Sequence, residues 1–262
     1  MFLHTYLPSS VFFTLGPLSF HWYGLLMSVA IVVGYLLVRK SAARQGKSPL
    51  VIDSLVVWLV VGGLIGARLF DAFFYEWWYF KNNPLEIFAF WQPGLSWHGA
   101  LLGGLVALWW WNKRRRESII NILGMLVPAL ALGQALGRFG NYFNQELYGL
   151  PTNLPWGIPI SPELRPLEYL TSPYFQPVFL YEFAGLVLIF IFLWHRRHQA
   201  SGGQQLAGYL ILTGLLRFAM EWLRLDSQPI LLGLRMGMWL ALLSIVVGLY
   251  LWFISRPRFS SA

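Results

Sequence analysis

Seven long apolar runs alternate with short polar connections along the 262-residue chain. A helix crosses a bilayer with about 17–25 mostly apolar residues, and every run falls in that range. The pattern therefore predicts an all-α polytopic membrane protein with seven transmembrane helices, built as a single transmembrane domain over residues 1–262. The runs are Phe20–Val38, Val51–Phe74, Leu95–Trp111, Ile119–Phe139, Pro177–Trp194, Leu206–Leu223 and Met236–Ile254.

The connection between the fourth and fifth runs, residues 141–176, is rich in proline and glycine and shows no helical period. It predicts an ordered but irregular cap or lid. The connection after the second run carries "FFYEWWYF" at Phe73–Phe80, which is typical of an aromatic belt at a membrane–water interface.

Basic residues gather in the segments that follow the first, third, fifth and seventh runs. In a seven-span arrangement these four segments lie on one side, and the positive-inside rule assigns that side to the cytoplasm. The N-terminus and the 141–176 cap are then periplasmic, and the C-terminus is cytoplasmic. The clustered residues are Arg39, Lys40, Arg44, Lys47, Lys113–Arg116, Arg196, Arg197, Arg256 and Arg258.

Composition narrows the class further. Hydrophobic residues make up 57% of the chain and charged residues 11%, whereas soluble proteins average about 25% charged. The formal net charge of +8 follows from the clusters between spans, so it indicates topology and no nucleic-acid partner. With no cysteine, the chain has no disulfide, thiolate metal site or cysteine nucleophile of its own. Because residues 1–20 hold no lysine or arginine, we expect no cleavable signal peptide.

Glycines recur four residues apart in three of the runs. Small residues at this spacing let helix backbones approach closely in lipid, so the pairs predict a tightly packed bundle. The pairs are Gly62 and Gly66, Gly99 and Gly103, and Gly133 and Gly137.

Several ionisable residues lie inside or beside the apolar runs, where a charge at the bilayer centre costs at least about 3 kcal/mol. They fall mostly in the outer halves of separate spans. That shared level predicts a cavity near the outer leaflet for an anionic lipid headgroup. The residues are Arg68, His98, Arg138, Glu146, Glu182, Arg217, Glu221 and Arg224.

Several of these residues have a plainer interpretation. Arg217, Glu221 and Arg224 lie on one helical face, as an ion pair at a helix end would require. Since two arginines there share one glutamate, Arg217 is an unmatched anion-site candidate. Arg138 could simply snorkel to the interface. However, asparagine, glutamine and glutamate follow it at Asn141–Glu146, and snorkelling requires only one polar tip.

His98 opens the third run at the same outer level. A lone histidine there is most simply a hydrogen-bonded packing residue, although imidazole also suits proton transfer near neutral pH. Tyr23 at the start of the first run is equally compatible with a belt residue.

The stretch "GRFGNYFNQELYG", Gly137–Gly149, resembles the signature G-R-x-x-N-[FY]-x-N-x-E-x-[WY]-G of the bacterial prolipoprotein diacylglyceryl transferase family. Other segments fit in the family's order, and the resemblance covers all but the last run and the loop tips. These segments are "HWYGLLM", "GGLIGARLF", "SWHGALLGG", "LYE" and "RFAMEWLR".

The resemblance implies a multi-pass enzyme of the bacterial inner membrane. It would transfer the diacylglyceryl group of phosphatidylglycerol to the lipobox cysteine of a prolipoprotein signal peptide, forming a thioether and releasing glycerol phosphate. The family's essential histidine maps to His98 and its essential arginines to Arg138 and Arg217. Further substrate-binding positions map to Tyr23, Arg68, Asn141, Asn144, Glu146, Gly149, Glu182, Glu221 and Arg224, of which Arg68 and Arg224 match positions that are usually basic.

The chain departs from the family pattern at positions expected to contact the site residues. Gln176 and Val178 stand where the family commonly has histidine and serine before "LYE", and Gly124 replaces a usual aspartate. Thr213 and Met238 stand where a tyrosine and a glutamine are often found. These differences bear on substrate preference and leave the mapped arginines and histidine in place.

In this interpretation Arg138 and Arg217 stabilise the charge that grows on the departing phosphate, and no metal or cofactor is needed. Either His98 takes the thiol proton, or Arg138 lowers the thiol pKa electrostatically. The rival class, an organic-anion or lipid transporter, would predict internal repeats and polar residues lining both leaflets, and neither is visible. An interaction scaffold would not require arginines at one outer level on separate spans.

Overall fold

The computed structural model of the chain describes residues 2–16, 18–90, 92 and 94–255. Arg256 and Arg258 of the last basic cluster lie outside these residues, as do Trp91 and Pro93 of the outer connection. The chain divides into two compact units. One is formed by Met1–Leu37 together with Leu123–Ala262, and the other by Val38–Ile122.

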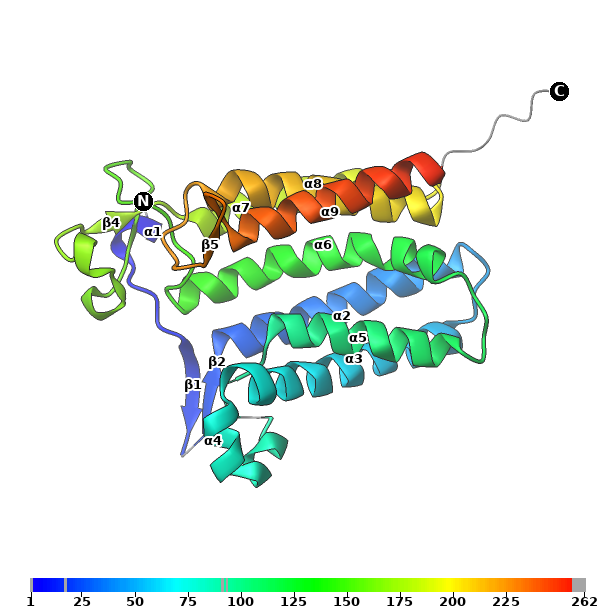
Figure 1. Ribbon diagram of the computed structural model, residues 1–262, viewed down its shortest axis with the longest axis horizontal. Coiled ribbons are helices and arrows are strands. Elements are labelled where there is room, and N and C mark those ends of the chain that lie inside the picture. The colour runs from blue at the N-terminus through cyan, green and yellow to red at the C-terminus, as the bar shows by residue number, and fades with distance from the viewer. Residues whose placement is uncertain (1, 17, 91, 93, 256–262) are drawn as a thin grey trace. The chain divides into compact units, whose positions relative to one another are not determined.

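Each of the seven apolar runs coincides over most of its length with one α-helix (Figure 1). The five that are long and apolar enough to cross a membrane are α2, α3 with its extension to Tyr75, α6, α7 and α9. Helix α5 has only 16 residues, and α8 carries Gln204, Gln205, Arg217 and Glu221. The structure thus has the helical, polytopic character expected of a membrane protein. The helices are α2 (Trp22–Ala43), α3 (Pro49–Phe70), α5 (Trp97–Asn112), α6 (Ile119–Phe143), α7 (Val178–Arg196), α8 (Gly202–Glu221) and α9 (Met236–Ile254).

Helix ends differ from the apolar boundaries where local chemistry sets them. Helix α8 begins at Gly202, four residues before its apolar run, because Ser201 and Gln204 form a capping box. Helix α6 continues to Phe143, four residues past its run. Helix α3 passes into a π-helical turn, η1 (Asp71–Tyr75), which is followed by α4 (Trp77–Asn82) and η2 (Pro84–Phe88).

Within the described parts of the connections lie three short antiparallel strand pairs, which the apolar pattern does not predict. The first pair directly precedes α2 and the last directly precedes α9. In each, main-chain N–H and C=O groups just before the helix are satisfied by pairing between the two strands. The pairs are β1 (Val11–Leu15) with β2 (Leu18–His21), β3 (Ile158–Pro159) with β4 (Tyr174–Phe175), and β5 (Ile230–Leu231) with β6 (Leu234–Arg235).

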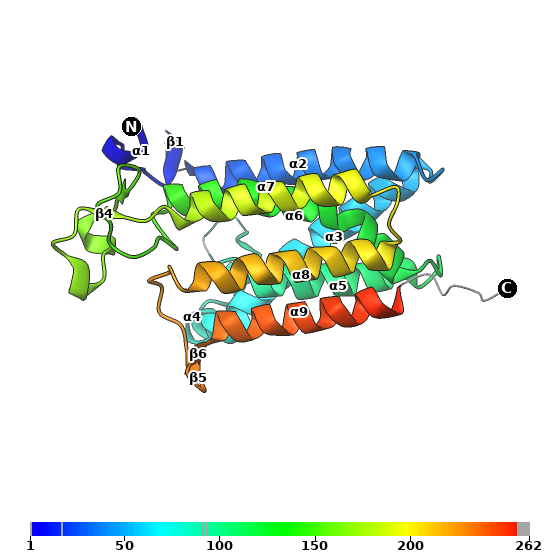
Figure 2. The same cartoon turned by 90° about the horizontal axis from the view of Figure 1, so that it is seen from above.

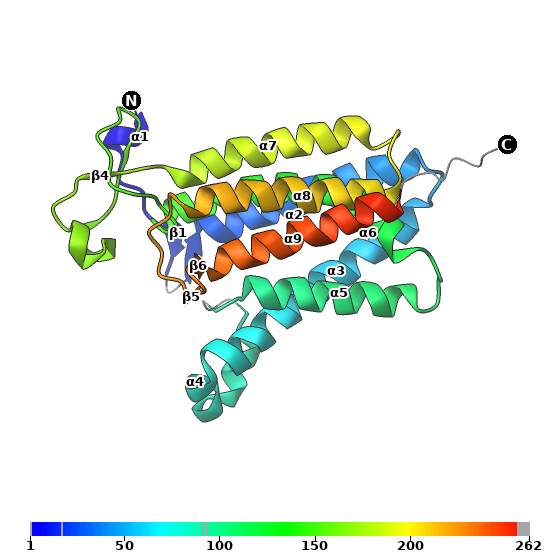
Figure 3. The same ribbon diagram turned by 45° about the horizontal axis from the view of Figure 1, so that its top comes forward.

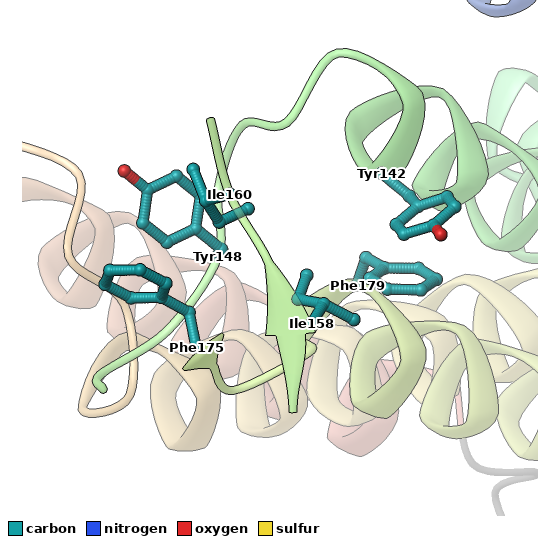
Figure 4. Close-up of a cluster of buried hydrophobic side chains, with 6 residues drawn as sticks. All are labelled: Tyr142, Tyr148, Ile158, Ile160, Phe175 and Phe179. Carbon is teal, nitrogen blue, oxygen red and sulfur yellow. The ribbon is translucent and has the colours of Figure 1, made fainter. Parts of the chain in front are cut away.

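The 141–176 segment has a small buried core of its own, although its only helices beyond α6 are the short η3 (Pro162–Leu164) and η4 (Leu167–Tyr169). Aromatic and branched side chains from the end of α6, from β3 and β4 and from α7 pack together there (Figure 4). Short α1 (Phe2–Thr5) joins the segment through a hydrogen bond between His4 Nδ1 and Gly157 O, 2.9 Å long. The core residues are Tyr142, Tyr148, Ile158, Ile160, Phe175 and Phe179.

Helices α3 and α5 pack backbone to backbone (Figure 3). A Cβ added to Gly66 would lie 2.4 Å from the carbonyl oxygen of Gly99, and one on Gly103 would lie 2.2 Å from that of Gly62. The predicted close approach is therefore confirmed for these two glycine pairs. In the other unit, a Cβ on Gly137 would lie 3.7 Å from Met27 Sδ, an ordinary contact that leaves room for a methyl group.

Helices α6 to α9 form the body of the larger unit, and Figure 2 shows α8 beside α9. Val127 and Ala131 of α6 pack with Ile189 and Leu193 of α7 in a buried cluster. This packing brings the end of α6, the start of α7, the end of α8 and the start of α9 to the same end of the unit. The candidate site is built there.

Candidate active site

Arg138 and Asn141 lie one turn apart on α6, because the helix continues past its apolar run. Arg138 Nη1 donates to Asn141 Oδ1 at 3.3 Å, and Asn141 Nδ2 donates to Glu146 Oε1 at 2.8 Å. Asn144 Nδ2 also donates to Glu146 Oε1, at 3.3 Å. Glu146 therefore accepts from both asparagines and ties the turn after α6 to the helix that carries Arg138.

The turn that follows is held by unusual backbone and by its side chains. Gln145 and Leu147 have φ values of +53° and +57°, a conformation that non-glycine residues seldom adopt. The Gln145 side chain donates to Pro8 O at 2.8 Å and accepts from Ser161 N at 2.6 Å. The strained turn thus connects the N-terminal segment with the 141–176 segment.

Gly149 lets this chain pass between two neighbouring segments. Its N–H donates to Gln176 O at 2.9 Å, and a Cβ there would lie 2.7 Å from Val178 Cγ2 and 2.9 Å from Leu223 O. Any side chain at this position would push apart the start of α7 and the segment after α8. The contacts of Gly149 are therefore those of a packing residue.

Glu182 on α7 joins three arginines from different parts of the chain. Its carboxylate lies 3.1 Å from Arg138 Nη1, 3.7 Å from Arg217 Nη1 and 3.7 Å from Arg224 Nη1. The Glu182 side chain is only 3% exposed. A buried carboxylate needs such partners, and Glu182 holds the guanidiniums of α6 and α8 close together.

Arg217 also pairs with Glu221 one turn further along α8, at 3.0 Å. Arg224 has a carboxylate of its own, since its Nε donates to Asp226 Oδ1 at 2.7 Å. The prediction that Arg217 is unmatched was therefore wrong. It counted only the charges on one face of the sixth run, whereas Glu182 on α7 pairs with Arg217 and Asp226 after α8 pairs with Arg224.

The sequence interpretation missed Asp226 and Arg235. Arg235 Nε lies 3.2 Å from Glu221 Oε1, and its Nη2 lies 3.6 Å from Asp226 Oδ1. Burial alone would raise the pKa of Asp226, but hydrogen bonds from Arg224 and Gln228 and the charges of Arg224 and Arg235 lower it below its ordinary value. The available signal was position, since Arg235 directly precedes the last apolar run on the side of the other arginines.

Glu182 and Glu221 are buried, whereas the guanidiniums of Arg138 and Arg217 remain partly exposed. The side chains of Arg138 and Arg217 are 22% and 30% exposed, whereas that of Glu221 is fully buried. Within the described residues, Arg138 Nε is buried and lacks a hydrogen-bond partner. An unpaired buried donor costs about 1–3 kcal/mol, so an anion accepting from it would be stabilising.

Tyr23 reaches the same end of the unit from α2. A Cβ on Gly140 would lie 2.4 Å from Tyr23 Cδ2, so the tyrosine ring packs directly on α6 between Arg138 and Asn141 in sequence. Seven further predicted residues share this unit with Tyr23 and the two arginines: Asn141, Asn144, Glu146, Gly149, Glu182, Glu221 and Arg224.

His98 and Arg68 belong to the other unit, Val38–Ile122. His98 Nδ1 lies 3.1 Å from Tyr75 Oη, and its ring lies 6.0 Å from the ring of Phe70. Ser96 caps the start of α5 by accepting from Gly99 N at 3.4 Å. These contacts fix the imidazole at the first turn of α5.

Arg68 is only 1% exposed, and its guanidinium lies within a cage of main-chain oxygens. Its nitrogens donate to the carbonyl groups of Ile87, Gly94, Glu86 and Ala89, at 3.2, 3.0, 3.0 and 2.6 Å. These bonds give Arg68 a structural role in the connection between α3 and α5, while its role in substrate binding stays a prediction.

Comparison with known proteins decides the family. The sequence model described as prolipoprotein diacylglyceryl transferase matches residues 10–254. The chain belongs to this family. It is 40% identical over 249 residues to the phosphatidylglycerol–prolipoprotein diacylglyceryl transferase of Synechococcus elongatus, covering 92% of this chain and 85% of the relative. The protein of that name from Gloeobacter violaceus is 38% identical over 255 residues, covering 95% of this chain and 94% of the relative.

Membership of the prolipoprotein diacylglyceryl transferase family gives the signature Gly137–Gly149 a physical reading in this chain. Arg138 and Asn141 face the buried carboxylate network, Gln145 and Leu147 form the strained turn, and Gly149 completes the packing. Asp226 and Arg235 lie outside the signature, yet Asp226 pairs with Arg224 and Arg235 pairs with Glu221 in the same network.

Proposed function

We propose that the chain transfers the diacylglyceryl group of phosphatidylglycerol to the lipobox cysteine of a prolipoprotein, forming a thioether and releasing glycerol phosphate. Family membership and the names of its relatives support the two substrates. The observation that carries the assignment of chemistry is the shared carboxylate Glu182, on which two partly open guanidiniums, Arg138 and Arg217, converge.

The reaction replaces one bond at a glycerol carbon. The bond from that carbon to a phosphate oxygen breaks, a carbon–sulfur bond forms, and the electron pair of the broken bond remains on the phosphate. Arg138 and Arg217 stabilise this growing charge, since oriented donors in a low-dielectric site act more strongly than in water. The free Nε of Arg138 supplies a donor that no described residue engages.

The thiol proton has two candidate acceptors. His98 can act as general base, with Tyr75 holding its ring orientation through Nδ1. In the alternative, the guanidinium of Arg138 lowers the pKa of the bound thiol, and water takes the proton. The pH profile of transfer by His98→Gln separates these routes.

The arrangement in the membrane completes the proposal. All seven long helices span the inner membrane of a bacterial cell as one domain, with the N-terminus and the 141–176 cap in the periplasm and the C-terminus in the cytoplasm. The lysines and arginines between spans support this orientation. The site requires no metal or cofactor. Of the positions mapped to substrate binding, Tyr23, Asn141, Asn144 and Glu146 contact phosphatidylglycerol beside the two arginines. Gly149, Glu182, Glu221 and Arg224 support the site through packing and ion pairs, and Arg68 supports its own unit.

The test uses the full chain in vesicles of phosphatidylglycerol with a lipobox peptide. Mass spectrometry should show a peptide heavier by one diacylglyceryl group, together with released glycerol phosphate. Arg114→Ala, at an exposed arginine between α5 and α6, should retain this activity. Lipid or organic-anion movement across the vesicle without a modified peptide would contradict the proposal and favour a transporter, which family membership does not favour.

A further inference from the structure

Arg235 occupies the chain reversal between α8 and α9. It is the last residue of β6, where it pairs with Ile230 of β5, and it is also the N-cap residue of α9. Its Nη1 donates to Glu221 O at 3.0 Å and to Arg224 O at 2.6 Å, and its Nη2 donates to Asp226 O. These acceptors include the last carbonyl of α8, so Arg235 caps the C-terminal end of the helix that carries Arg217.

The same guanidinium also pairs with two carboxylates. Arg235 Nε lies 3.2 Å from Glu221 Oε1, while Arg217 Nη2 lies 3.0 Å from the other oxygen, Glu221 Oε2. Glu221 is fully buried between them. Without Arg235, this carboxylate would have Arg217 as its single ion-pair partner among the described residues and would offset the positive charge of Arg217.

Arg235 gives the ion-pair network its net positive charge. The direct ion pairs connect four guanidiniums, Arg138, Arg217, Arg224 and Arg235, with three carboxylates, Glu182, Glu221 and Asp226. The formal charge of this set is +1. Removing Arg235 would lower the formal charge of the set to zero. The side chain of Arg235 is 20% exposed and does not pair with Glu182, the carboxylate shared by Arg138 and Arg217, so its influence on these two arginines is indirect.

Neighbouring contacts fix Arg235 in this role. Gln228 Nε2 donates to Asp226 Oδ2 at 2.8 Å, and Gly237 N donates to Gln228 Oε1 at 2.9 Å. Met236 N donates to Pro229 O at 2.9 Å. The segment from Asp226 to Gly237 is therefore bonded to itself on both sides of the guanidinium.

We infer that Arg235 is a positioning residue for the phosphate-binding arginines: it neutralises Glu221 and caps α8, so that Arg217 keeps its charge and direction for an anionic phospholipid. This rests on the proposed function only in taking phosphatidylglycerol as the lipid. Arg235 acts through Glu221 and Arg217, and it does not itself contact the reacting atoms.

The experiment compares binding and turnover for Arg235→Gln. Affinity for short-chain phosphatidylglycerol is measured by calorimetry in detergent, and kcat is measured separately with a lipobox peptide. The Kd should rise by about tenfold, since the network loses its net positive charge. Adding Glu221→Gln to this variant returns the formal charge to +1, and the Kd should then return to within about threefold of the wild-type value. A purely structural role predicts that the double variant is worse than the single one.

Arg165→Gln is the matched control, because Arg165 donates to the carbonyls of Ile160 and Leu170 in the cap but forms no ion pair with a carboxylate among the residues that the structure describes. Its Kd should stay near that of the wild type. Should Arg235→Gln not fold, Arg235→Lys keeps the charge and should bind within about threefold of the wild type, as should the double variant. An unchanged Kd in folded Arg235→Gln, or a double variant weaker than the single, would overturn the inference. A wild-type chain that binds the lipid but makes no thioether would instead contradict the proposed function alone.

Discussion

Arg68 and Arg138 are both arginines near the end of a long helix, yet their surroundings differ in kind. Arg68 gives its donors to four main-chain carbonyls and lies 5.1 Å from the ring centroid of Phe80. Arg138 shares a buried carboxylate with Arg217, and its Nε has no partner within the described part of the chain. A guanidinium saturated by the main chain holds a fold. One that rests on a shared carboxylate retains donors for a ligand.

The largest expected effect is at the two convergent arginines. Arg138→Ala and Arg217→Ala should each lower kcat/KM for lipid transfer by about 10³, because each removes a donor to the developing phosphate charge. Thermal unfolding should confirm that both variants fold. Transfer at more than about a tenth of the wild-type rate in either variant would contradict the comparison.

His98 tests whether the unit that contains Arg68 supplies chemistry as well as structure. As general base, it should contribute about 10² to kcat, and His98→Gln should lose that factor across pH 6–9. The measurement is the pH profile of single-turnover transfer. Near wild-type turnover over this range would assign the thiolate to arginine assistance instead.

Arg68→Met should act mainly on stability. It leaves four carbonyl groups without their shared donor, and we expect a loss of about 3 kcal/mol in the free energy of unfolding. Below the unfolding transition, the KM for phosphatidylglycerol should change by less than about threefold. The control is Arg114→Ala, which should not alter stability. A variant of normal stability with a much higher KM would show that Arg68 binds the lipid and would remove the contrast with Arg138.

The smallest effect concerns acid sensitivity of the network. The pKa of Asp226 is lowered in the folded state, so its ion pairs stabilise the fold above the ordinary aspartate pKa of about 3.9. This contribution is lost as the pH falls through the lowered value. Asp226→Asn should therefore be less stable at pH 7 by about 1 kcal/mol and lose less stability between pH 7 and pH 3. The measurement is thermal unfolding at both pH values. Equal losses of stability in the wild type and in Asp226→Asn between pH 7 and pH 3 would rule out this role.

The helices could be predicted because a bilayer-length apolar run leaves little alternative to a helix, and α9 has the bounds that its run predicts. The ends required separate information. Ser201 extended α8 through a cap, and strand pairs such as β1–β2 formed where apolar patterning says nothing about main-chain pairing.

Within the candidate site, the signature identified Arg138 and Asn141 because both lie on one helical face. Glu182 was predicted as a polar residue of the fifth run and through the family segment "LYE", but its pairing with Arg138 was not, since no spacing connects it with an arginine on α6. Arg235 was missed because it meets Glu221 through a chain reversal, and helical periodicity does not extend across one. The carbonyl cage of Arg68 depends on loop backbone, which residue types alone do not specify.

The most direct test of the central claim is a structure of the full chain with phosphatidylglycerol bound in a lipid nanodisc. We predict that the phosphate lies between Arg138 and Arg217, with one oxygen accepting from Arg138 Nε at about 2.9 Å. A phosphate bound elsewhere, with both guanidiniums still turned only toward Glu182, would contradict the claim.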